Sequence, residues 1–206
     1  MNSRERFTLR RFAEYVVRPV QRPTLISTHR QALETGYRPI YDPYRFLIRA
    51  IVHMHEQGLP PESLEAAVER ERSSRQRNVI GEAMTDYVGW VAAADITGCF
   101  PVAATDWRCE EACVRVNPEV GLEIGGERLI VKLHLAKGSP ISPDEAAVMT
   151  TVMREGLGDA VPGDCGMAVL DVRTGVLHRE TPADDSLRLA IQTAAVDLAA
   201  RWEQAS

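Results

Sequence analysis

The chain of 206 residues is long enough to bury a hydrophobic core and short enough to form one domain. Apolar residues make up 45% of it and charged residues 26%, with a net charge of −5, so composition argues against a disordered or fibrous protein. No apolar run reaches the roughly 20 residues of a membrane span, and neither a signal-like N-terminus nor a disulfide framework is recognisable. We therefore expect a cytoplasmic protein with no membrane partner.

Residues 1–96 are predicted to form a helical N-terminal segment of this single domain. Within residues 43–57 the apolar side chains recur at spacings of three and four, which is typical of one buried helix face, and Gly58 ends the helix. A second helix is expected after Pro60 and Pro61, from residue 62 towards residue 94. Residues 97–108 contain Gly98 and Pro101 and are predicted to be a loop.

Residues 97–206 are predicted to form a strand and helix core. From residue 112 the apolar period changes to two, and Gly125-Gly126 separates two such runs as in a β-hairpin. A helix is expected over residues 143–157, with Ser142 and Glu145 forming a capping box, then strands on both sides of Gly175 and a helix over residues 186–202. The predicted fold is α/β (α+β): a mixed sheet with a central hairpin and flanking helices.

The hairpin places charged side chains on one face of the sheet. If Gly125 and Gly126 are the loop residues, Glu119 lies opposite Lys132 and Glu123 lies opposite Arg128. The other face is wholly apolar. The polar pairs either face solvent, as in any half-exposed antiparallel sheet, or are pushed into a cleft because helices cover both faces of the sheet.

This segment resembles the core of the PD-(D/E)xK nuclease superfamily. Pro118-Glu119 stands where that family has its first acid, and Lys132 where it has its lysine. Glu82, in the helix before the strands, stands for an acid on the preceding helix. The residue at the second acid position is Ile130, which cannot bind a metal ion.

The resemblance implies two activities, between which the sequence does not decide. In the first, Glu119 with Glu82 or Glu123 holds Mg²⁺ and Lys132 orients the attacking water, so that the protein is a Mg²⁺-dependent phosphodiester hydrolase. In the second, the loss of the second acid has impaired catalysis and the protein only binds nucleic acid. Arg10 and Arg11 of the arginine-rich N-terminus, together with Arg128, are the candidate nucleic-acid contacts.

A third reading, from another class, is a non-enzymatic interaction or scaffold protein, for which a homodimer is one form. Some residues are ambiguous in the same way. Tyr44 and Arg45, with aromatic and basic neighbours at Tyr37, Arg38 and Tyr41, suit either a nucleic-acid surface or packing between helices. The four cysteines are interpreted as free thiols, and His53 and His55 as ordinary helix residues.

Overall fold

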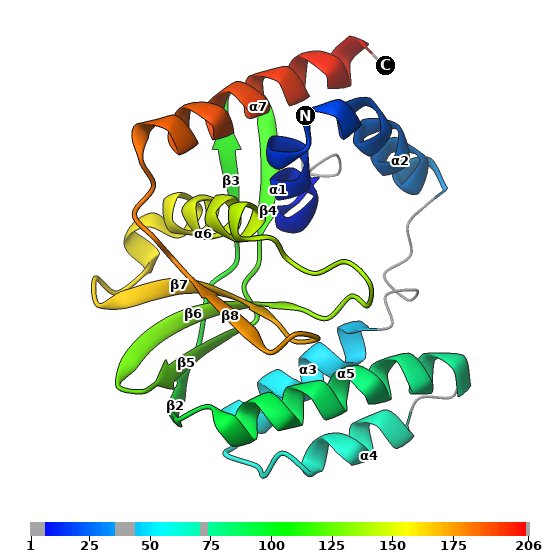
Figure 1. The fold of residues 1–206 in the computed structure, drawn as a ribbon, viewed down its shortest axis with the longest axis vertical. Coiled ribbons are helices and arrows are strands. Elements are labelled where there is room, and N and C mark those ends of the chain that lie inside the picture. The colour runs from blue at the N-terminus through cyan, green and yellow to red at the C-terminus, as the bar shows by residue number, and fades with distance from the viewer. Residues whose placement is uncertain (1–6, 36–43, 71–73, 205–206) are drawn as a thin grey trace.

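The computed structural model describes residues 7–35, 44–70 and 74–204, which form a mixed α/β structure (Figure 1). The elements of the N-terminal part are β1 (Phe7–Thr8), α1 (Leu9–Val17), α2 (Arg22–Glu34), α3 (Tyr44–Glu56), α4 (Ser63–Glu69) and α5 (Ser74–Ala93). They are followed by β2 (Ile96–Phe100), β3 (Thr105–Cys109), β4 (Ala112–Val116), β5 (Val120–Ile124), β6 (Glu127–His134), α6 (Pro143–Leu157), β7 (Cys165–Asp171), β8 (Val176–Arg179) and α7 (Asp185–Gln204).

The larger sheet has five strands in the order β2-β5-β6-β7-β8. β6 and β7 are parallel and are connected by α6, whereas the other pairs are antiparallel. The β5–β6 hairpin turns at Gly125 (φ 58°) and Gly126 (φ 82°), both in the left-handed region that a tight two-residue turn requires. The predicted register is confirmed, since Val120 pairs with Val131 and Glu123 with Arg128.

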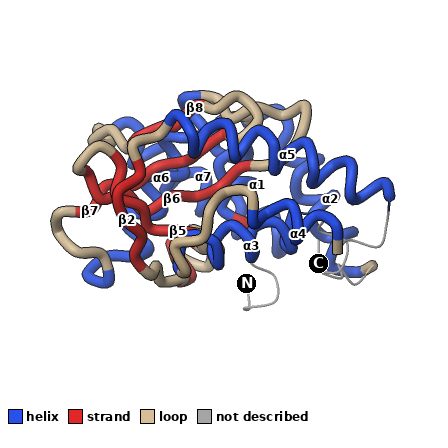
Figure 2. The backbone as a smooth tube through the Cα atoms, turned by 90° about the horizontal axis from the view of Figure 1, so that it is seen from below, coloured by secondary structure: helices blue, strands red, loops and turns tan. Residues whose placement is uncertain are grey.

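Helices α3, α4 and α5 lie on one side of this sheet, and α6, α1 and α7 lie on the other (Figure 1). The apolar face of the hairpin packs against α3 and α5, where Leu47, Ile51, Ile80 and Tyr87 are buried. Figure 2 shows the strands gathered in one part of the molecule with helical segments around them. Both sheet faces are therefore covered, which is the second of the two arrangements that the sequence left open.

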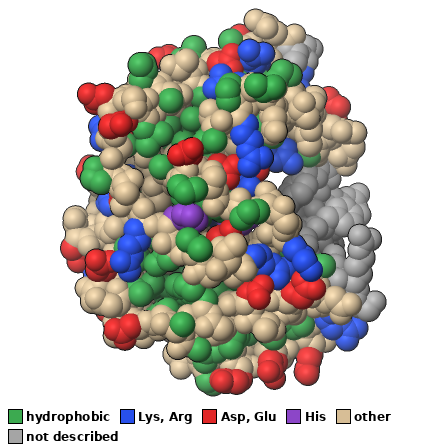
Figure 3. All heavy atoms as spheres, in the orientation of Figure 1, with side chains coloured by type: hydrophobic (Ala, Val, Ile, Leu, Met, Phe, Trp, Pro, Cys, Tyr) green, Lys and Arg blue, Asp and Glu red, His purple; other side chains and the backbone are tan. Residues whose placement is uncertain are grey.

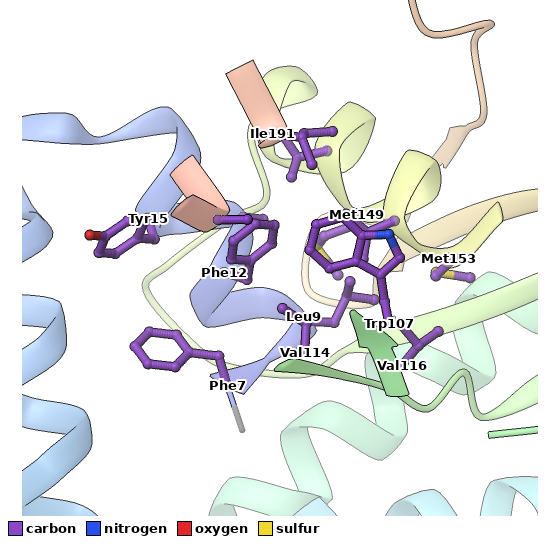
Figure 4. Packing of buried hydrophobic residues seen from close by; sticks show 14 of the residues in the cluster. Phe7, Leu9, Phe12, Tyr15, Trp107, Val114, Val116, Met149, Met153 and Ile191 are labelled. Atoms are coloured by element: carbon purple, nitrogen blue, oxygen red, sulfur yellow. The ribbon is translucent and has the colours of Figure 1, made fainter. Parts of the chain in front are cut away.

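A second hydrophobic cluster lies on the α6 side and includes the three-stranded sheet β1-β4-β3. Its centre is aromatic: the rings of Phe12 and Trp107 lie 5.3 Å apart beside Met149 (Figure 4). The two ends of the described chain meet in this cluster, because the Phe7 ring lies 6.0 Å from that of Trp202. Residues from both predicted segments thus build this second cluster.

The N-terminus of α6 carries the predicted capping box. Ser142 Oγ accepts from the Glu145 amide at 3.2 Å, and Glu145 Oε2 accepts from the Ser142 amide at 3.1 Å. These two bonds satisfy donors that the first turn of a helix otherwise leaves free. The cap fixes where α6 begins and so how it crosses the sheet.

Two predictions in the middle of the chain are wrong. The predicted loop over residues 97–108 holds most of strand β2 and most of β3. Strand β2 is possible there because it is an edge strand, where glycine is tolerated, and Pro101 falls just beyond its end. The helix expected over residues 62–94 is divided into α4 and α5, with residues 71–73 between them outside the described part. Among the helices that the structure describes, none combines the length and apolar character that a membrane crossing requires.

Candidate functional site

Glu119 and Lys132 meet as the register predicts. The Lys132 ammonium donates to Glu119 Oε1 and, at 3.0 Å, to the carbonyl oxygen of Asn117. Both side chains are sheltered, with exposed fractions of 14% for Lys132 and 7% for Glu119. The pair therefore lies in the covered layer on the α6 side of the sheet and not on a wet sheet face.

The Glu119 carboxylate also extends the β-ladder. Its Oε2 accepts from the Leu133 amide at 2.7 Å, just beyond the bond from the Glu119 amide to the Val131 carbonyl at 3.1 Å. Burial raises the pKa of the Glu119 carboxyl, and the Lys132 ammonium and the Leu133 amide oppose that rise. Both carboxylate oxygens are thus occupied by donors of the chain itself.

The position of the missing second acid is part of the hydrophobic core. Ile130 is 4% exposed and belongs to the cluster with Met149, Met153 and Met167. A carboxylate at this place would lie among apolar side chains. The isoleucine is therefore explained by packing beneath α6.

Glu82 lies on the opposite side of the sheet from Glu119. It belongs to α5, which covers the apolar face of the hairpin, whereas Glu119 and Lys132 alternate with the residues of that face. Glu82 instead pairs with Lys137 at 2.8 Å and with Arg173 at 3.7 Å, and Lys137 lowers the pKa of the Glu82 carboxyl. The structure does not bring this predicted ligand to the Glu119 site.

Glu123 and Arg128 lie together at the turn end of the hairpin, with Arg128 Nε 3.7 Å from Glu123 Oε1. Glu123 is four residues from Glu119 along the strand, which amounts to about 13 Å. Arg128 also pairs with Asp164 at 3.1 Å and stacks over the Phe100 ring at 4.5 Å. Its charge is therefore already matched by two carboxylates.

Arg10 turns inward to the carboxyl end of β6. It donates from Nη2 to Ser139 Oγ at 2.9 Å and pairs with Glu14 at 3.0 Å. His134 Nε2 lies 2.7 Å from the Ser139 carbonyl oxygen. In the tautomer with the proton on Nε2, the ring donates to that oxygen, and Nδ1 accepts from Arg10 Nη1 at 3.1 Å. Burial first, and then the Arg10 charge, lowers the pKa of His134. Nearby, the fully buried Glu145 pairs with Arg18 at 2.7 Å.

The third predicted arginine contact, Arg11, is half-buried on α1 and lies 3.5 Å from His29 Nδ1. Figure 3 shows that basic and acidic side chains adjoin one another over much of the viewed face. Tyr37, Arg38 and Tyr41 lie outside the described residues. Arg49 and Arg70 are further exposed arginines that no motif in the sequence singled out, although Arg49 follows Arg45 by one helical turn of α3.

The donor set around Glu119 does not suit a magnesium ion. That ion needs several oxygen ligands, and here the one carboxylate is held by an ammonium and a backbone amide. Over the described ranges, no three His, Cys, Asp or Glu side chains form a group able to hold a metal ion. Comparison with models of protein families and with curated proteins finds no match for the sequence.

Proposed function

We propose that this chain is a PD-(D/E)xK-like protein that binds nucleic acid without cleaving it. The support for the family is the order of the elements: α5, then the antiparallel strands β2, β5 and β6, then α6 crossing to the parallel strand β7. The β3–β4 hairpin is inserted between β2 and β5. Glu119 directly before β5 and Lys132 on β6 occupy the places that the resemblance assigns to the acid and the lysine.

The observation that supports the loss of cleavage is that both carboxylate oxygens of Glu119 accept hydrogen bonds from the chain itself. Metal-assisted hydrolysis needs carboxylate oxygens directed at the ion, and both oxygens of Glu119 accept from the chain. Releasing them would leave the Lys132 ammonium and the Leu133 amide without their partner in a covered layer. Because Ile130 lies in the core, we assign the Glu119–Lys132 ion pair a structural role, in which it links β6 to the residues before β5.

Nucleic acid is the proposed ligand class because the chain offers arginines that the described acidic residues do not neutralise. Arg45 and Arg49 on α3 and Arg70 after α4 are among the described arginines that form no ion pair with described residues. Arg45 and Arg49 are exposed, as is Arg70. Such side chains contact phosphates and release counterions when they do so.

The test uses fluorescently labelled single-stranded and duplex oligonucleotides with Mg²⁺ or Mn²⁺ at low and moderate salt. We expect binding that weakens as salt rises and no cleavage products, in the wild-type chain and in Glu119→Gln alike. Metal-dependent cleavage that both Glu119→Gln and Lys132→Met abolish would show an enzyme and refute the proposal. Absence of salt-sensitive binding would refute the nucleic-acid half of it.

A second candidate function is self-association through α7. Its outer side exposes Leu189 (64% exposed) and Val196 (51% exposed), seven residues and two helical turns apart. If α7 packs antiparallel on α7 of a second copy with Val196 near the twofold axis, Arg188 of each copy approaches Glu203 of the other. Both side chains are exposed and neither forms an ion pair with the described residues, so the helix is complementary to itself in charge.

A further inference from the structure

A pocket of about 350 Å³ lies between α3 and α4. Met54 and Leu64, which are 2% and 1% exposed, belong to its buried lining. Phe46 and Leu59 also line it, but each keeps 40% of its surface exposed. The pocket thus has an apolar interior and an exposed aromatic ring at its rim, and its volume is in the range of small-ligand sites.

Among the described residues that line this pocket, the ionisable side chains are two arginines and one histidine. Arg49 and His53, one helical turn apart on α3, face it together with Arg70 at the end of α4. The acids of α4, Glu65 and Glu69, are not among the lining residues. In a chain whose net charge is −5, a pocket whose described lining residues include two arginines and no carboxylate is suited to an anion.

The positions of Phe46, Arg49 and Arg70 indicate which kind of anion the pocket suits. Phe46 and Arg49 are three residues apart, so they project from the same side of α3, and Arg70 contributes from the neighbouring helix. An aromatic ring accepts a flat ring against its face, and guanidinium groups bind phosphate with paired hydrogen bonds. The pocket therefore combines a surface for a flat ring with two phosphate donors.

We infer that the pocket between α3 and α4 binds a nucleotide, with its base against Phe46 and its phosphate held by Arg49 and Arg70. The nucleotide is either free in solution or a unit of a single strand. In the second case the inference deepens the proposed function and rests on it, because it names where the strand binds. The surface differs from the one that Arg10, Arg11 and Arg128 would have formed.

The experiment measures fluorescence anisotropy with a labelled oligo-dT and calorimetric binding of AMP and dTMP to the full chain. The variants are Arg49→Glu, Arg70→Glu and Phe46→Ala. Arg108→Glu is the matched control, since Arg108 is exposed on β3 and forms no ion pair with the described residues. Circular dichroism confirms that each variant is folded.

We expect each arginine variant to bind at least about tenfold more weakly at low salt, with a shallower salt dependence. Phe46→Ala should lose about five- to hundredfold through the lost stacking, and Arg108→Glu should stay within about twofold of the wild type. If the wild type binds oligo-dT and the variants Arg49→Glu and Arg70→Glu bind it equally well, the inference is overturned and the proposed function is kept. Binding of mononucleotides that is lost in these variants, without oligonucleotide binding, would keep the inference and refute the proposed function. Binding of neither ligand refutes both.

Discussion

Removal of the Lys132 ammonium tests whether the Glu119–Lys132 ion pair stabilises the folded protein. Lys132→Met keeps most of the side-chain volume but leaves the Glu119 carboxylate in a site where it is 7% exposed. Its remaining partner is the Leu133 amide at 2.7 Å. Breaking a buried ion pair on one side costs about 3 to 5 kcal/mol, because the other charge stays buried without compensation.

Glu119→Gln should cost less than Lys132→Met. The amide oxygen of a glutamine can still accept from the Leu133 amide, and Lys132 keeps its bond to the Asn117 carbonyl at 3.0 Å and some contact with solvent. We expect a loss of about 1 to 2 kcal/mol. In the double variant no carboxylate is stranded, so its loss should fall short of the sum of the single losses by about 1 to 3 kcal/mol.

Urea denaturation at pH 7 measures the free energy of unfolding of the wild type, the two single variants and the double variant, which together form a double-mutant cycle. For a chain of this size the Lys132→Met loss corresponds to a melting temperature lowered by roughly 6 to 20 °C. The deficit should shrink as the pH falls, because a protonated Glu119 no longer needs a cation. The reasoning is refuted if Lys132→Met lies within about 0.5 kcal/mol of the wild type, or if the two single losses simply add.

Two further predictions concern pH and assembly. Burial lowers the pKa of His55, which lies 2.7 Å from the Tyr87 hydroxyl, and that of His134. The unfolded chain binds these protons at a higher pH than the folded chain does, so the free energy of unfolding should fall as the pH drops below about 6.5, by at most about 1.4 kcal/mol per pH unit for each histidine. Thermal melts of His134→Gln should show a melting temperature that depends less steeply on pH than that of the wild type. An equally steep pH dependence would contradict this prediction. If α7 pairs two copies, the wild type should sediment as a dimer at micromolar concentration and Val196→Glu as a monomer, and a monomeric wild type would exclude that interface.

The part of the fold that the sequence predicted best is the β5–β6 hairpin. Alternating apolar residues specify which face is buried, and a two-residue glycine turn fixes the register, so the approach of Glu119 to Lys132 follows from local rules. The α6 cap was predictable for the same reason, since Ser142 and Glu145 are three residues apart. Short-range patterns therefore account for the centre of the site.

What the sequence could not predict depends on contacts between distant segments. Glu82 was expected to share a metal site with Glu119, but helix periodicity does not tell which sheet face a helix covers, and α5 covers the opposite face. The inward turn of Arg10 depends on Ser139 and His134, more than 120 residues away. That Arg45 and Arg49 form no ion pair with the described residues could be recognised only after the contacts of the folded chain were known.

The meeting of Phe7 and Trp202 in one aromatic cluster has a consequence for how the chain is made. The cluster between the hairpin and α3 draws on residues 47 to 172, so it can form before α7 has docked. The other cluster has to wait for α7, and until then the nascent chain carries Phe12 and its neighbours without cover. Chaperone protection during synthesis would therefore be needed mainly by the segment that carries Phe7 and Phe12.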